Sequence, residues 1–215
     1  MDDARIQLMR ELLEGTEWAA RTRGFARSLR TAGHSRGHLL IVGTPHDEPW
    51  HMTAHLEQES LLAGVPELAP TLVRHHVPIG APPHLAVDLT RLEAAGRGET
   101  VFVLAPTPSG EQVLERIADA RRSGAVVLAL EDGDRELRGL AHEALTVAQG
   151  TQPLWPGPAL RPDGVIIAPA AAFETAQHLV SLAAGETPAG AGSRRGFRDR
   201  LSRWLETLSG PAQVH

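Results

Sequence analysis

Short apolar runs alternate with amphipathic stretches along most of this chain, which is typical of strands and helices that alternate in sequence. Buried strands are predicted over residues 38–43, 71–77, 101–105 and 126–130, and a last apolar strand follows residue 141. Helices are predicted over residues 3–31, 52–63 and 83–95, and between Gly110 and Ser123. Continuously apolar strands of this kind belong to parallel sheets that helices cover on both faces.

The alternation predicts an α/β fold with a doubly wound, mainly parallel five-stranded sheet in flavodoxin-like order. Ligands of such sheets bind outside the carboxyl ends of the strands, where the strand order reverses. The loops that follow Gly43 and Ala105 are the two candidates for this crevice.

The turn after residue 105 carries a candidate anion site. Thr107, Ser109 and Gly110 lie where a strand ends and a helix begins, so hydroxyl groups and free backbone N–H groups converge at the positive end of a helix dipole. This arrangement predicts that the turn binds a phosphate group.

The motifs around this turn resemble the sugar isomerase (SIS) family, within its phosphoheptose isomerase-like branch. Leu92-Glu93-Ala94-Ala95-Gly96 matches the end of a family helix, and Thr107-Pro108-Ser109-Gly110 matches the Ser-x-Ser-Gly loop. The resemblance implies an SIS-like fold and the binding of a phosphorylated sugar. The residues that it implies for phosphate and sugar binding are Gly43, Thr44, Thr107, Ser109, Gly110, Glu111 and Gln112.

Both loops depart from the family pattern. The family carries a Gly-x-Gly-x-Ser loop after its first strand, whereas residues 43–50 read GTPHDEPW, with two prolines that lack an N–H and two carboxylates that an anionic ligand would meet. In the second loop Thr107 replaces a serine, and Gln112 replaces a frequent threonine. These departures favour a binding module over ordinary sugar-phosphate turnover.

The resemblance also implies a catalytic pair for isomerisation, a carboxylate base and a histidine acid. The base position falls at Glu57, with Glu59 two residues later, and the acid falls at His178 in a phrase that matches the family imperfectly. The alternatives are that one of the two glutamates is a solvated surface residue and that His178 is a helix-surface histidine without a functional role. Two further functions therefore stay open, a non-catalytic phosphosugar-binding module and a structural or interaction protein.

The composition bears on which classes of ligand the chain can bind. The chain has no cysteine, and its net charge of −5 argues against nucleic-acid binding. No cofactor and no metal site are predicted. A metal alternative stays open, because His51 and His55 are four residues apart on a predicted helix and His46 precedes them by one loop.

Three segments are predicted: an SIS-like domain over residues 1–184, a flexible linker over 185–196 and an amphipathic helix over 197–210. The C-terminal helix is expected to dock on its own domain or a partner, and contact with a membrane surface is the less favoured alternative. A homodimer or homotetramer is expected, because Met9, Leu12, Leu13 and Trp18 make the N-terminal helix strongly apolar. With no signal peptide or membrane span in the sequence, the cytoplasm is the expected location.

Overall fold

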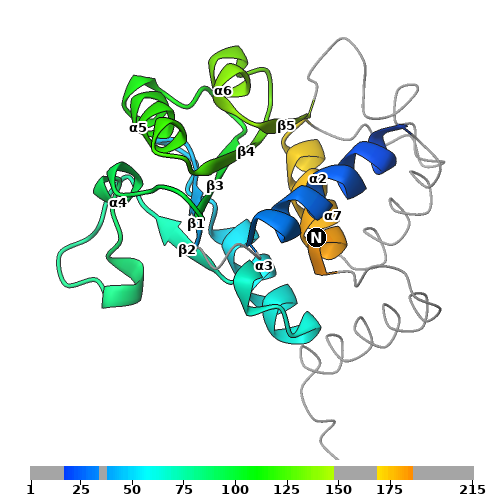
Figure 1. Cartoon of the computed structure of the whole chain (residues 1–215), viewed down its shortest axis with the longest axis horizontal. Coiled ribbons are helices and arrows are strands. Elements are labelled where there is room, and N and C mark those ends of the chain that lie inside the picture. Colours follow the sequence, from blue (N-terminus) through cyan, green and yellow to red (C-terminus); the bar gives the residue numbers. More distant parts are fainter. Residues whose placement is uncertain (1–16, 34–37, 148–168, 186–215) are drawn as a thin grey trace, which may run out of the picture.

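The computed structural model describes residues 17–33, 38–147 and 169–185, and it centres on a five-stranded parallel sheet (Figure 1). The strands are β1 Leu39–Val42, β2 Pro70–Val73, β3 Thr100–Ala105, β4 Val126–Glu131 and β5 Glu143–Thr146. Their spatial order is β2-β1-β3-β4-β5, and all four neighbouring pairs are parallel. The predicted doubly wound α/β fold is therefore confirmed.

Helices cover both faces of this sheet. The α-helices are α2 Glu17–Gly33, α3 Trp50–Ala63, α4 Thr90–Glu93, α5 Glu111–Arg122, α6 Arg135–Leu140 and α7 Pro169–Gly185. Two short 3-10 helices, η1 Pro66–Leu68 and η2 Pro83–Leu85, precede and follow β2 along the chain. In Figure 1, α2, α3 and α7 group together, and α4, α5 and α6 lie across the sheet from them.

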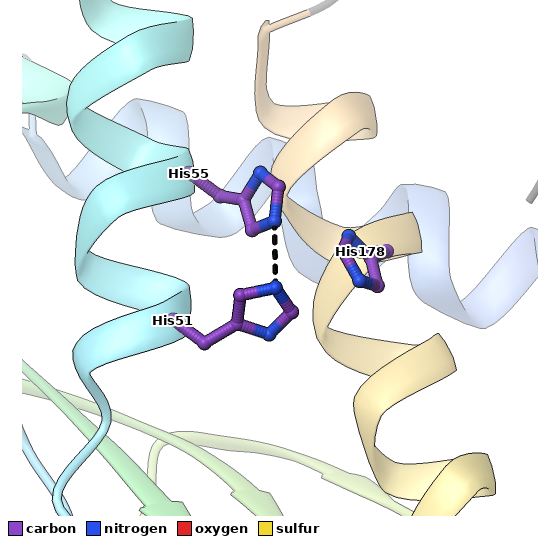
Figure 2. A group of neighbouring side chains, drawn as sticks. All are labelled: His51, His55 and His178. Atoms are coloured by element: carbon purple, nitrogen blue, oxygen red, sulfur yellow. Dashed lines mark hydrogen bonds between the residues drawn. The ribbon is translucent and has the colours of Figure 1, made fainter. Parts of the chain in front are cut away.

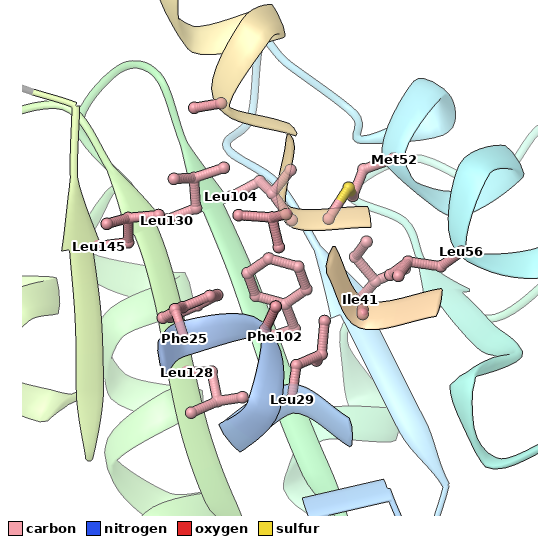
Figure 3. Close-up of a cluster of buried hydrophobic side chains, with 14 of the residues drawn as sticks. Phe25, Leu29, Ile41, Met52, Leu56, Phe102, Leu104, Leu128, Leu130 and Leu145 are labelled. Carbon is pink, nitrogen blue, oxygen red and sulfur yellow. The ribbon is translucent and has the colours of Figure 1, made fainter. Parts of the chain in front are cut away.

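Two apolar cores follow from the alternation of side chains along the strands. In β1, Leu39 and Ile41 point into the core under α2, α3 and α7, whereas Leu40 and Val42 point into the core under α4, α5 and α6. Phe102 lies in the middle of the first core, where its ring centroid is 5.6 Å from that of Phe25 (Figure 3). Because both of their faces are buried, the central strands β1, β3 and β4 consist almost entirely of apolar residues.

The strand register brings the two candidate loops to the same end of the sheet. Val42, the last residue of β1, pairs with Val103, and β3 continues to Ala105. The strand order reverses between β1 and β3, so the crevice expected of this fold lies between the loops that follow them.

Two predictions about elements are wrong. The helix expected over residues 83–95 is replaced by the separate short helices η2 and α4, because Asp88 accepts hydrogen bonds from the backbone N–H and the hydroxyl of Thr90 and so starts a new turn there. The strand expected over 71–77 ends at Val73. Beyond it, Arg74 makes only an isolated bridge to Asp88 before Pro78.

Several predictions concern residues outside the described part of the chain. The first half of the N-terminal helix, the linker after Gly185 and the helix over 197–210 belong to this group. Among the helices that the structure describes, none has the length and apolar character needed to cross a bilayer.

Candidate functional site

The loop after β1 turns back on itself directly after Gly43. A Cβ added to Gly43 would lie 1.9 Å from the carbonyl oxygen of Asp47 and 2.8 Å from Cδ of Pro49, so only glycine fits. Thr44 and Asp47 close the turn by exchanging two backbone hydrogen bonds of 3.2 Å each. The turn thereby holds the Asp47 side chain at the carboxyl end of the sheet.

Asp47 joins the two candidate loops. One of its carboxylate oxygens accepts from the Thr44 hydroxyl at 3.1 Å and from the Thr107 hydroxyl at 3.1 Å, and the two hydroxyl oxygens are 3.0 Å apart. Hydroxyl groups that would donate to a phosphate therefore donate to a carboxylate of the chain itself. A bound anion would have to displace Asp47 or bind beside it.

Ser109 is fully buried and donates to Asp134 twice, through its backbone N–H at 2.9 Å and its hydroxyl at 2.8 Å. The other Asp134 oxygen accepts from the Leu137 N–H at 2.9 Å and so caps α6. Burial raises the pKa of Asp134, but these hydrogen bonds outweigh it and hold the pKa below its ordinary value. Ser109 thus anchors the second loop, and its hydroxyl hydrogen is already engaged.

The N-terminus of α5 keeps free donors. Its N-cap is Gly110, with φ of +78° and no side chain to cap the first turn. Glu111 and Gln112 follow, both exposed. The first backbone N–H groups of a helix have no partner within the helix, and here they end beside Thr107 at the carboxyl end of β3.

The two predicted glutamates lie on different sides of α3. Glu57 is exposed. Glu59 packs against the end of α7, because a Cβ added to Gly185 would lie 1.7 Å from a carboxylate oxygen of Glu59. The catalytic pair of one of these glutamates with His178 therefore stays a prediction.

His178 instead meets His51 and His55. The three ring centroids are 4.5 Å from one another, and the Nε2 atoms of His51 and His55 are 3.0 Å apart (Figure 2). His178 is 4% exposed, and its Nε2 atom is buried without a hydrogen-bond partner. Sequence reasoning found His51 and His55 as a pair but placed His46 with them. His46 is exposed, and it is not part of this cluster.

Burial keeps two of these imidazoles neutral. Desolvation, followed by the charges of His55 and His51, lowers the pKa of His178 to about 3. Desolvation and then the charge of His51 lower the pKa of His55 to about 4. Both rings therefore offer a lone pair at neutral pH.

We expect the metal-free protein to lose stability as the pH falls from 6.5 to 5. The unfolded chain binds protons at His55 and His178 below about pH 6.5, whereas the folded chain does not until about pH 4 and 3. Stability is thus complete above pH 6.5 and decreases below it. The slope is at most about 1.4 kcal/mol per pH unit for each histidine, and it is smaller for the half-buried His55 because solvent reaches its ring.

Urea unfolding in EDTA at several pH values measures this slope, and the window above pH 5 avoids the carboxyl groups. The slope should be smaller in His55→Gln and unchanged in His46→Ala. An equal slope in all three proteins would assign the effect to other groups.

Residues beyond β2 support the first loop, and sequence reasoning missed them. Nε2 of His75 donates to the Gly43 carbonyl at 3.0 Å, and Arg74 forms a 3.0 Å ion pair with Glu48. The Arg74 guanidinium also lies 4.7 Å from the Trp50 ring centroid. No signal in the sequence identified them, because the strand predicted over residues 71–77 enclosed both Arg74 and His75.

No protein-family model matches the sequence, and no curated protein matches it. Solved structures do match. A sugar-binding candidate from Salmonella typhimurium LT2 matches 92% of this chain at 11% identity with a TM-score of 0.50, and the chain spans about half (52%) of that protein. The Vibrio vulnificus NanR protein in complex with ManNAc-6P matches 100% of the chain and 77% of its own at 15% identity and a TM-score of 0.46.

The sugar isomerase domain of the RpiR transcription factor from Sphaerobacter thermophilus also matches, over 95% of this chain and 99% of its own, at 14% identity and a TM-score of 0.47. At these identities, similarity concerns the fold alone. The β2-β1-β3-β4-β5 parallel sheet and the helices on both of its faces agree with the resemblance found in the sequence. The chain thus has the doubly wound parallel α/β fold that the sequence predicts, and its similarity to the sugar isomerase (SIS) family stays a resemblance.

Proposed function

We propose that the chain binds a phosphorylated sugar or sugar derivative in the crevice between the loops after β1 and β3. The observation that carries this proposal is the uncapped N-terminus of α5, which opens at the reversal of strand order beside the Thr107 hydroxyl. The SIS-like fold and the motif resemblance point to the same class of ligand.

In this proposal the two loops contact different parts of the ligand. The phosphate contacts the backbone N–H groups at Gly110, Glu111 and Gln112, together with the Thr107 hydroxyl. Thr44 and Asp47 line the sugar side of the crevice, where the Asp47 carboxylate accepts from the hydroxyls of Thr44 and Thr107 and weakens the binding of an anion. Gly43 and Ser109 act indirectly, because they fix the course of each loop.

A second candidate function, aldose–ketose isomerisation, would require a base and an acid at the sugar. His178 is buried and neutral at physiological pH, so it does not supply an imidazolium acid. Glu57 is exposed, and isomerisation by this pair of residues is therefore not favoured. Binding without turnover is the function that we favour.

A matched pair of variants at Glu111 tests the phosphate site. Glu111 is the first helical residue of α5, where proline is well accepted, and Gly110 has the extended ψ of 149° that precedes proline. Glu111→Pro removes one N–H donor together with the carboxylate, and Glu111→Ala removes the carboxylate alone. We expect Glu111→Pro to bind a sugar phosphate about tenfold more weakly than Glu111→Ala, the effect of one charge-assisted hydrogen bond.

Calorimetry with sugar 6-phosphates and with the same sugars lacking phosphate measures this difference. The unphosphorylated sugars should bind equally to both variants. Equal affinity of the two variants for the sugar phosphate would mean that the phosphate does not bind at the N-terminus of α5. Absence of binding of any phosphosugar would refute the proposal.

Cytoplasmic location and assembly as a homodimer or homotetramer also stay predictions. Leu61 and Leu62 of α3 are exposed apolar side chains that a second subunit could cover. Contact of the C-terminal helix with a membrane stays the less favoured alternative.

A further inference from the structure

We propose that residues 197–210 dock as an amphipathic helix on the last turn of α3 in the same chain, where Leu61 and Leu62 are exposed. These two side chains are 77% and 38% exposed, whereas Met52 and Leu56 of the same helix are completely buried. α3 thus presents apolar side chains in two directions, and the described residues cover only one of them. We call Leu61 and Leu62 the α3 patch.

The C-terminal segment has the pattern of a helix that needs such a surface. Phe197, Leu201, Leu205 and Leu208 lie at i, i+4, i+8 and i+11, on one face of the predicted helix. A helix of about 14 residues is only marginally stable alone in water, so it forms when this face is buried. Arginines on its other faces stay in water, which restricts the segment to a site on the surface of the domain.

The course of the chain brings the segment to the α3 patch. α7 ends at Gly185, directly against the side chain of Glu59 in α3. Leu62 lies three residues beyond Glu59, which is about 5 Å further along the helix axis. The predicted linker over residues 186–196 spans about 18 Å on average for its composition. The patch is therefore within reach, and the tether gives the segment an effective concentration in the millimolar range.

Opposite charges favour the same contact. The carboxyl end of a helix carries a partial negative charge, and Arg30 complements that of α7 by donating to the Ala184 carbonyl at 2.8 Å. The last turn of α3 has no basic residue. Glu57 is exposed one turn before Leu61 and has no cationic partner among the described residues. The five arginines within residues 194–203 can supply the missing positive charge.

Cross-linking of the full chain tests this contact, because the chain has no cysteine and an introduced pair can be followed alone. Leu61→Cys combined with Leu205→Cys should form a disulfide within one molecule on mild oxidation. Ile79→Cys combined with Leu205→Cys is the control, since Ile79 is fully exposed in the loop that follows β2, at the other end of the sheet from the end of α3. We expect the first pair to cross-link at least about tenfold faster on non-reducing gels.

Hydrogen exchange checks the contact without introduced cysteines. Leu61→Asp should speed exchange of the backbone amides over residues 197–210 by at least about tenfold, and Ile79→Asp should leave it unchanged. Both side chains are exposed, so both variants should fold.

Equal cross-linking of the two cysteine pairs would overturn the proposal, as would equally fast exchange over residues 197–210 in the unaltered chain and in Leu61→Asp. A cross-linked dimer in place of the disulfide within one molecule would also overturn it, because a second copy would then occupy the α3 patch. None of these results bears on phosphosugar binding, which is proposed for the carboxyl end of the sheet and is measured separately.

Discussion

Gly43→Ala is expected to destabilise the domain by about 3 kcal/mol and to abolish phosphosugar binding. The new Cβ would lie 1.9 Å from the Asp47 carbonyl oxygen, a backbone atom that cannot move without breaking the Thr44–Asp47 turn. Because His75 donates to the Gly43 carbonyl, the strain would also reach the end of β2. Urea unfolding monitored by circular dichroism measures the loss.

Gly139→Ala is the matched control for this change. Gly139 lies in α6, and a Cβ there meets nothing within 4 Å, so the substitution should be neutral or stabilise the helix by about 0.5 to 1 kcal/mol. A folded, fully stable Gly43→Ala protein that still binds ligand would contradict the tight turn.

Asp47→Asn is expected to bind phosphate and sugar phosphates about tenfold more tightly than the unaltered chain. The carboxylate accepts from the hydroxyls of Thr44 and Thr107 and repels an anion placed between the loops. A negative charge about 5 Å from a phosphate costs about 1 to 3 kcal/mol at effective dielectric constants of 80 to 20. Asparagine keeps the shape and removes this charge. Calorimetry at low salt measures the gain, which should shrink as salt is added.

Asp119→Asn provides the control, since it makes the same change of charge near the far end of α5, where Asp119 pairs with Arg122. Its anion affinity should match that of the unaltered chain. Weaker binding by Asp47→Asn would show instead that this carboxylate holds sugar hydroxyl groups directly and that its contribution exceeds its repulsion.

The fold could be predicted because its signals are local. Each of the strands β1, β3 and β4 is an apolar run that helices bury on both sides, and the amphipathic pattern of α5 lies between two of them. The helix over residues 83–95 was mispredicted for an equally local reason. Its apolar spacing suggested one helix, but the hydrogen bonds that Asp88 accepts from Thr90 divide it into η2 and α4.

The candidate site could be predicted only in part, because its contacts join residues that are distant in sequence. The resemblance placed Thr107 and Ser109 in a phosphate loop, yet nothing near them in sequence revealed that Asp47 and Asp134 would accept their hydroxyl hydrogens. Likewise, the spacing of His51 and His55 indicated a pair, but only the packing of α7 against α3 identifies His178 as the third member.

The polar character of one side of α3 has a consequence for the newly synthesised chain. His55 and His178 are more than a hundred residues apart, and at about 5–20 residues per second the ribosome needs several seconds or more to deliver α7 after α3. During that time α3 exposes Met52 and Leu56 of the core that α7 helps to close, together with the polar His55 and Glu59 that contact α7 in the folded chain. Because the polar side chains interrupt the apolar surface, the area of α3 that other nascent chains could bind is smaller than that of a continuous apolar stripe.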